Sequence, residues 1–224
     1  PQDGNIIYFQ EDKNTLDILN KGNWSQLIPI GTNNSYDVDY KNNLILAEGA
    51  EFSLQDFMIF GSHNAKNVIS AIAATNVNGV SVEEAINALQ SFQGVKRRLE
   101  LKYQDSSIII IDDFAHHPTA IKYSIDAVKR KFKESKLIGL IELGSNTMSD
   151  GIHGDSLVKA ASELDSVIWI DENGVLSESS NSTFASDTLC INALKKELKK
   201  YDILLIMTNK NSERLWKPII EYIQ

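Results

Sequence analysis

Residues 108–121 read Ile-Ile-Ile-Ile-Asp-Asp-Phe-Ala-His-His-Pro-Thr-Ala-Ile, which joins a strand-like run to a helix-like run. Four consecutive β-branched residues predict a strand that is buried on both faces. Pro118 suits the first turn of a helix, because its ring presets φ and its missing N–H costs nothing there. Apolar residues then recur at helical spacing, at Ile121, Ile125, Val128 and Phe132. The stretch therefore predicts a strand, a polar loop rich in titratable groups, and an amphipathic helix.

Length and composition place few limits on the fold but exclude several classes of function. The chain has 224 residues, of which 42% are hydrophobic and 23% charged, as expected for one or two globular domains. A net charge of −8 argues against a nucleic-acid surface and favours small molecules or proteins as partners. The single cysteine, Cys190, excludes an internal disulfide and fits a reducing compartment. No apolar run approaches about 18 residues and no leader is recognisable, so we expect a cytoplasmic protein without membrane contact.

Residues 1–93 predict a small β-rich segment followed by two helices. Asn42-Asn43 separates the strand-like runs 36–40 and 44–47, which indicates a hairpin. One helix opens within residues 61–67, and Ser81 with Glu84 forms the capping box of a second helix. We place a domain boundary at Gly94, giving domains 1–93 and 94–224. Because the chain starts at Pro1, directly before a strand-like run, we expect it to be part of something longer.

From Gly94 onward, strand-like and helix-like segments alternate at a spacing typical of parallel βαβ units. Strands are predicted at 108–112, 137–141, 166–170 and 203–207, and helices near 119–132, 155–163, 188–199 and 213–223. The fold class is therefore α/β, with a mostly parallel sheet. Ligands of such sheets bind beyond the carboxyl ends of the strands. We expect one shared rim of polar residues, formed by Asp112, Asp113, residues 142–147, Asp171, Thr208 and Asn209.

Two further groups of residues are candidates for ligand binding. Asn64 and Asn67 lie three residues apart, so both amides project from one face of a helix; they either cap it or bind the edge of a heterocycle. Lys96, Arg97 and Arg98 form a compact cationic run in an acidic protein. This run is either a solvated turn or the source of one arginine that binds an anion, since guanidinium pairs well with phosphate oxygens.

Three motifs together resemble the Mur ligases of bacterial cell-wall synthesis in order and spacing. They are Gly-Ser-His-Asn-Ala-Lys-Asn at 61–67, Phe-Gln-Gly-Val-Lys-Arg-Arg-Leu-Glu at 92–100 and Asp-Asp-Phe-Ala-His-His-Pro-Thr at 112–119. Phe114-Ala115, and Glu142 followed by residues 145–148, point to the murein peptide ligase branch. Members of that branch use ATP to join UDP-N-acetylmuramate to L-alanyl-γ-D-glutamyl-meso-diaminopimelate. The resemblance implies the end of a Mur ligase central domain at 1–93 and a Rossmann-like C-terminal domain at 94–224.

The resemblance also implies a role for individual residues. Asn64 and Asn67 would hold adenine, Arg98 would contact the terminal phosphate of ATP, Asp113 would bind the ribose, and Phe114 would lie against the base. The amine-bearing peptide would contact His117, Ser145, Asn146, Thr147 and Met148. Arg98 and His117 would serve catalysis, in which an acyl phosphate forms on the muramoyl carboxylate and the peptide amine displaces phosphate. The implied cofactors are ATP and Mg²⁺, and no residue of this chain is assigned as a metal ligand.

The sequence departs from the family pattern in three places. It has no glycine-rich lysine loop for phosphates and no UDP-sugar domain, so we expect a C-terminal portion that needs the missing N-terminal part and is inactive alone. Leu143-Gly144 replaces the family's Pro-Arg, which bears on peptide specificity. Residues 207–212, Met-Thr-Asn-Lys-Asn-Ser, stand where the family has Met-Ser-Asn followed by a glycine-rich stretch.

Two other functions remain open from the sequence. Asp112, Asp113, His116 and His117 are the residue types of a metal-dependent phosphohydrolase. Neighbours on an extended chain point to opposite faces, however, which opposes their convergence on one metal. The third possibility is a non-catalytic nucleotide-binding module.

Overall fold

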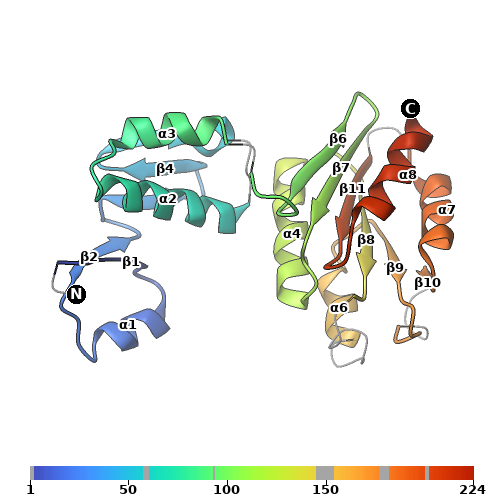
Figure 1. Ribbon diagram of the computed structural model, residues 1–224, viewed down its shortest axis with the longest axis horizontal. Coiled ribbons are helices and arrows are strands. Elements are labelled where there is room, and N and C mark those ends of the chain that lie inside the picture. Colours follow the sequence, from blue (N-terminus) through green and yellow to red (C-terminus); the bar gives the residue numbers. More distant parts are fainter. Residues whose placement is uncertain (1–2, 58–60, 93, 145–153, 177–181, 200–201) are drawn as a thin grey trace. The chain divides into compact units, whose positions relative to one another are not determined.

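A computed structural model describes residues 3–57, 61–92, 94–144, 154–176, 182–199 and 202–224. The chain divides into two compact units, Pro1–Gln93 and Gly94–Gln224, called here the N-terminal unit and the C-terminal unit. Figure 1 labels their helices and strands, and each unit is described by itself.

The N-terminal unit is one five-stranded sheet with helices. Its strands follow the order β1-β2-β3-β4-β5, parallel from β1 to β3 and antiparallel from β3 to β5. The core is formed where α2 packs against the sheet and α3, and its fully buried side chains include Ile45, Ile69 and Ile72. The elements are β1 Asn5–Phe9, α1 Lys13–Leu19, β2 Gln26–Ile30, β3 Tyr36–Asp39, β4 Leu44–Ala47, β5 Ala50–Ser53, η1 Leu54–Asp56, α2 Ser62–Asn76 and α3 Val82–Gln90.

The predicted hairpin is confirmed as β3 and β4, with Asn43 in the left-handed conformation that the turn requires. The capping box is also confirmed, since Ser81 Oγ accepts from Glu84 N at 3.2 Å and Ser81 N donates to the Glu84 carboxylate at 3.0 Å. The sequence prediction missed α1, which begins after the capping carboxylate of Asp12. This helix has no buried residue, so it lacks the apolar face by which a helix is recognised.

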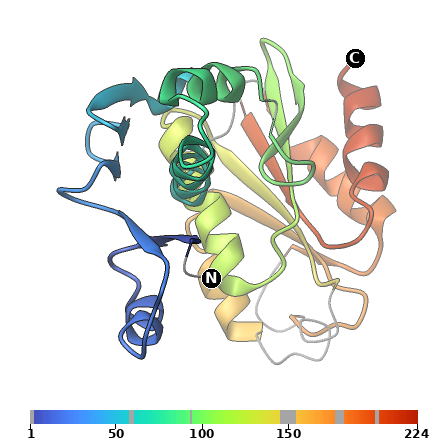
Figure 2. The ribbon, with the colours of Figure 1, turned by 60° about the vertical axis from the view of Figure 1, so that its left-hand side comes forward.

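The C-terminal unit has three layers. Its six-stranded sheet has the order β10-β9-β8-β11-β7-β6, and every pair is parallel except β6 with β7. Helices α4 and α6 cover one face of the sheet, and α7 and α8 cover the other (Figures 1 and 2). The elements are β6 Glu100–Gln104, β7 Ile108–Asp113, α4 Pro118–Lys131, β8 Leu137–Glu142, α6 Gly154–Ala160, β9 Ser166–Ile170, β10 Thr183–Phe184, α7 Asp187–Glu197, β11 Asp202–Met207 and α8 Glu213–Ile223.

The predicted α/β class and mostly parallel sheet are confirmed. All six residues are buried in each of the central strands β8 and β11, as expected for strands covered on both faces. The sequence prediction missed β6, an antiparallel edge strand, and the two-residue β10. No helix within the described residues combines the length and apolar character that crossing a membrane requires.

Candidate functional site

The carboxyl ends of three neighbouring strands in the C-terminal unit form one connected polar edge. Glu142 ends β8, Asp113 ends β7, and Thr208 directly follows β11. The Thr208 hydroxyl donates to Glu142 Oε2 at 2.5 Å, and Thr208 N donates to the Asp113 carbonyl oxygen at 3.2 Å. The rim expected at the ends of the parallel strands is therefore present for these three residues.

Asp113 connects three segments around this edge. Its Oδ2 accepts from Leu99 N at 2.7 Å, and its Oδ1 accepts from Ala115 N at 2.8 Å and Ser124 Oγ at 3.1 Å. The residue is only 4% exposed. The carboxylate therefore holds the segment before β6, the loop after β7 and helix α4 together, and about one of its four acceptor positions remains.

The side chain of Asp112 contacts different partners from those of Asp113. Its Oδ2 accepts from Ser212 Oγ at 2.6 Å and lies 3.5 Å from Arg97 Nε, while its buried Oδ1 has no hydrogen-bond partner among the described residues. Burial raises the pKa of Asp112 above its ordinary value, against the opposing effects of Ser212 and the Arg97 charge. The two adjacent carboxylates thus serve separate contacts, as side-chain alternation along a strand requires.

The geometry does not support the metal-dependent phosphohydrolase. Within the part of the chain that the structure describes, no group of three or more His, Cys, Asp or Glu side chains is arranged to hold a metal ion. His116 Nδ1 instead lies 2.9 Å from the carbonyl oxygen of Phe114, and its ring meets the Phe114 ring edge-on at 5.2 Å between centroids. The described side chains therefore do not form a complete metal site by themselves.

The loop between β7 and α4 has the predicted form. His117 is extended, with φ −118° and ψ 145°, and Pro118 opens α4. The His117 side chain is exposed, whereas Phe114 is half-buried. The other residues predicted to bind the peptide, Ser145, Asn146, Thr147 and Met148, lie outside the described residues.

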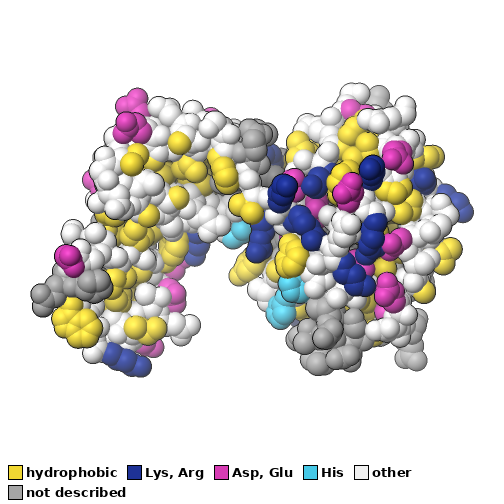
Figure 3. Space-filling view, viewed as in Figure 1, with side chains coloured by type: hydrophobic (Ala, Val, Ile, Leu, Met, Phe, Trp, Pro, Cys, Tyr) yellow, Lys and Arg dark blue, Asp and Glu magenta, His cyan; other side chains and the backbone are white. Residues whose placement is uncertain are grey.

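The two arginines of the cationic run differ in their surroundings. Arg98 is exposed, and the structure gives its guanidinium no hydrogen bond or ion pair to the described residues. The Arg97 side chain is 24% exposed and reaches inward to Asp112 and to the carbonyl oxygen of Thr208. Lys and Arg side chains gather on the face of this unit shown in Figure 3. The sequence prediction selected Arg98 for an anion and did not foresee the inward role of its neighbour.

Two non-glycine residues in this segment have left-handed backbone conformations, Arg97 with φ +59° and Leu99 with φ +52°. Such conformations cost about 1–2 kcal/mol each and persist where surrounding contacts impose them. Here Leu99 N binds Asp113, and Arg97 N donates to Glu100 Oε2 at 2.8 Å. The segment before β6 is therefore held in a strained shape by specific partners, a feature common at functional sites.

A second charged cluster surrounds Glu142, which is 1% exposed. Its Oε1 lies 2.5 Å from Arg214 Nη2 and 3.1 Å from Lys210 Nζ, and Arg214 also pairs with Asp187. Burial lowers the pKa of Lys210, but Glu142 and Glu172 outweigh it and raise that pKa above the ordinary value. Sequence reasoning identified Glu142 but missed the ion pairs of Lys210, in the β11–α8 loop, and of Arg214, on α8, since a basic residue in a loop or on an amphipathic helix carries no local signal.

In the N-terminal unit, Asn64 and Asn67 lie together on the first turn of α2. Asn67 Nδ2 is 3.4 Å from Asn64 Oδ1, so the expected shared face is present. The cap of this helix is Gly61, with φ +98° and no side-chain hydrogen bond, so neither asparagine is the cap residue.

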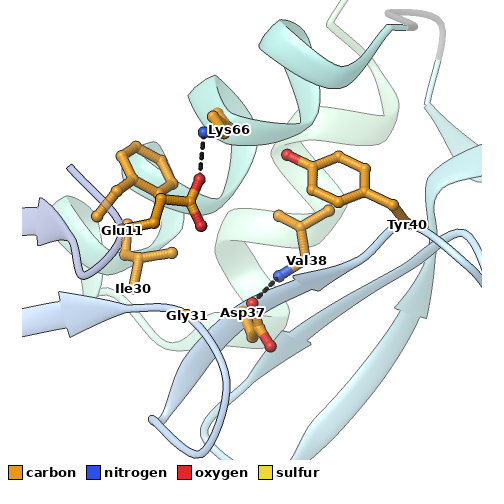
Figure 4. A pocket seen from close by; sticks show the side chains of 8 residues that line it. Glu11, Ile30, Gly31, Asp37, Val38, Tyr40 and Lys66 are labelled. Atoms are coloured by element: carbon orange, nitrogen blue, oxygen red, sulfur yellow. Dashed lines mark hydrogen bonds and ion pairs between the residues drawn. The ribbon is translucent and has the colours of Figure 1, made fainter.

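A small pocket lies beside this turn (Figure 4). Lys66 Nζ lies 2.6 Å from Glu11 Oε1 and 4.8 Å from the centroid of the Phe9 ring. Burial raises the pKa of Tyr40 on the other side of the pocket. The lining residues are Phe9, Glu11, Ile30, Gly31, Asp37, Val38, Tyr40 and Lys66. The sequence contained no signal for this pocket, because its walls come from three strand ends and a helix.

Comparisons with known proteins agree with the motifs. Residues 97–209 match the family model described as Mur ligase, glutamate ligase domain. The chain belongs to the Mur ligase family.

The individual relatives of this Mur ligase chain include members of the murein peptide ligase branch. It is 32% identical over 176 residues to the UDP-N-acetylmuramate–L-alanyl-γ-D-glutamyl-meso-2,6-diaminoheptandioate ligase of Haemophilus influenzae, covering 76% of this chain and 39% of that protein. A murein peptide ligase of Psychrobacter arcticus has 30% identity and a TM-score of 0.66, covering 99% of this chain and 51% of that one. The UDP-N-acetylmuramoylalanyl-D-glutamyl-2,6-diaminopimelate–D-alanyl-D-alanyl ligase of Acinetobacter baumannii has 19% identity, a TM-score of 0.75 and coverage of 99% and 52%, and shows the fold alone. The chain thus spans about two fifths to one half of these relatives.

The structure explains one departure of this Mur ligase chain from the family pattern. A Cβ atom at Gly144 would overlap the Asn209 amide oxygen and lie 3.2 Å from Lys210 Cγ. Residues of the β11–α8 loop thus occupy the space that a side chain at position 144 would need. Gly144 is therefore packed directly against the loop that follows β11.

We expect Gly144→Ala to destabilise the C-terminal unit by about 1–3 kcal/mol, because an added methyl in a packed site forces its neighbours to move. Urea unfolding followed by tryptophan fluorescence measures the change. Asn209→Ala in the same chain removes the overlapping amide and should restore most of the loss. A double variant as unstable as Gly144→Ala alone would contradict this packing explanation.

Proposed function

We propose that this chain is the C-terminal part of an ATP-dependent ligase that joins UDP-N-acetylmuramate to L-alanyl-γ-D-glutamyl-meso-diaminopimelate in the bacterial cytoplasm. The observation that carries the proposal is the arrangement around residues 97–119. An exposed arginine, a half-buried aromatic ring and a buried carboxylate lie on one continuous, internally tethered segment at the carboxyl edge of the sheet. This is where open α/β sheets bind their ligands.

Five residues are proposed to contact ATP. Asn64 and Asn67 would offer amide donors and acceptors to the adenine edge, and Arg98 would bind the terminal phosphate. Phe114 would lie against the base. Asp113 has about one acceptor position left after its three internal hydrogen bonds, enough for one ribose hydroxyl.

The proposed reaction has two steps. The muramoyl carboxylate attacks the terminal phosphorus of ATP, which forms an acyl phosphate and releases ADP. The peptide amine then attacks the acyl carbon, the C–O bond to phosphate breaks, and an amide and inorganic phosphate result. The chain's part is positioning and cationic stabilisation by Arg98, with His117 and residues 145–148 contacting the peptide. Magnesium would be held by parts of the enzyme outside this chain.

Titration of ATP into the 224-residue chain, followed by NMR chemical shifts, tests the nucleotide site. Arg98→Ala should weaken ATP binding about tenfold or more, because a charge-assisted hydrogen bond to phosphate is worth about 1.5–3 kcal/mol. Lys96→Ala, which removes a neighbouring exposed cation, serves as the matched control and should change the affinity less than about twofold. Equal ATP affinity in Arg98→Ala and the unmodified chain would contradict the assignment.

We also expect the chain alone to make no amide product from ATP, UDP-N-acetylmuramate and tripeptide, because it has no glycine-rich lysine loop to hold the phosphates. A coupled phosphate-release assay with product detection by mass spectrometry measures this. The complete relative from Haemophilus influenzae serves as the positive control. ATP-dependent product from the 224-residue chain would show that the expectation is wrong.

A further inference from the structure

We propose that Arg97 is a positioning residue of the nucleotide site: it fixes the Phe114 ring that would lie against adenine and directs Arg98 outward. This inference rests on the proposed function, because it concerns the same site. It assigns a role to a second arginine, whose side chain faces inward, whereas the side chain of Arg98 is exposed.

The side chain of Arg97 connects the ends of two strands with the aromatic ring. Its Nη2 donates to the Thr208 carbonyl oxygen after β11, and its Nε lies 3.5 Å from Asp112 Oδ2 in β7. The guanidinium carbon lies 4.9 Å from the centroid of the Phe114 ring. A planar, delocalised cation can stack on a ring while its edge donates hydrogen bonds, which the single ammonium of lysine cannot do.

The backbone of Arg97 also holds Phe114 in place and helps to set the direction of Arg98. Its carbonyl oxygen accepts from Phe114 N at 2.8 Å, so the residue holds Phe114 by both main chain and side chain. Arg98 lies between two left-handed residues, and each of these is tethered through its N–H, Arg97 to Glu100 and Leu99 to Asp113. With both neighbours fixed, the direction of the Arg98 side chain from the chain is also fixed.

The two adjacent arginines therefore have different tasks. Arg97 is engaged by an acidic, a carbonyl and an aromatic partner, so its charge is committed within the unit. Arg98 is exposed and its guanidinium has no such partner among the described residues. Loss of Arg97 should consequently affect contacts to the base, and loss of Arg98 should affect contacts to the phosphates.

Affinities for ATP and for inorganic tripolyphosphate separate these tasks. Arg97→Lys keeps the charge beside Asp112 but loses the planar guanidinium whose carbon lies 4.9 Å from the Phe114 ring centroid, and it should weaken ATP binding about fivefold to tenfold, given about 1–1.4 kcal/mol for such a contact. Tripolyphosphate affinity should stay within about twofold. Arg98→Ala should weaken the binding of both ligands. In a chain that already carries Phe114→Ala, adding Arg97→Lys should not lower the affinity for ATP any further. Lys195→Gln, which removes a cation 4.9 Å from the Tyr222 ring in the same unit, is the matched control and should leave both affinities unchanged.

Unchanged ATP affinity in Arg97→Lys overturns the proposal, as does an equal loss for both ligands, which would indicate a simple charge effect. If the unmodified chain binds neither ligand, the proposed function fails. The positioning role is then decided by the NMR signals of a ¹³C-labelled Phe114 ring. Arg97→Lys should shift these signals and Lys195→Gln should not; signals that stay in place in Arg97→Lys overturn the proposal.

Discussion

Replacing Asp113 with alanine is expected to destabilise the C-terminal unit by about 3–5 kcal/mol. The carboxylate accepts from two backbone N–H groups, of Leu99 and Ala115, and from the Ser124 hydroxyl, and the site is 4% exposed. Alanine leaves these buried donors without partners, and each costs about 1–3 kcal/mol. Unfolding in urea, followed by fluorescence of the buried Trp169, measures the loss.

Asp105 provides a matched control for this substitution. It also accepts from two backbone N–H groups, of Ser107 and Ile108, and from a side-chain hydroxyl, of Tyr103, but at an exposed turn. Water can replace a lost partner there, so Asp105→Ala should cost clearly less. Ser124→Ala, which removes one donor together with its need for an acceptor, should cost about 1 kcal/mol. Equal losses in Asp113→Ala and Asp105→Ala would refute the argument that burial decides the cost.

Glu142→Ala is expected to destabilise the same unit by about 3–5 kcal/mol, because it removes the shared partner of two cations and a hydroxyl. Among the described residues, Arg214 would keep Asp187, Lys210 would keep the more distant Glu172, and the buried Thr208 hydroxyl would lose its acceptor. The same urea unfolding experiment measures this change.

The matched control for Glu142→Ala is Glu172→Ala. Glu172 lies 3.5 Å from the same lysine, but its side chain is 59% exposed. A surface ion pair of this kind contributes about 0–1 kcal/mol. If both variants lose the same stability, the network at the carboxyl edge does not depend on its buried carboxylate.

The elements that were predictable from the sequence are those buried on a regular pattern. Strand β7 and helix α4 were placed to within one residue, because four isoleucines and the proline at 118 mark the strand and the helix start. Helix α1 has no buried face, and β10 has two residues, so neither offers a period to detect. Strand β6 lies at a sheet edge, where it is only partly buried.

The site was predictable where topology alone determines it. Parallel strands end at one edge, so Asp113, Glu142 and Thr208 could be expected near one another. The choice between Arg97 and Arg98 was not accessible, because the residues are identical and adjacent, and a left-handed backbone decides which one faces inward. The roles assigned to Asn64, Asn67, Phe114 and His117 remain predictions.

The position of β11 has a consequence for synthesis on the ribosome. It lies between β7 and β8, although residues 114–201 separate it from β7 in the chain. A nascent polypeptide that has not yet released residues 202–207 exposes two long, apolar strands without their shared neighbour, and such unpaired edges favour self-association. Assembly of this unit should therefore be delayed until residues 202–207 have left the ribosome.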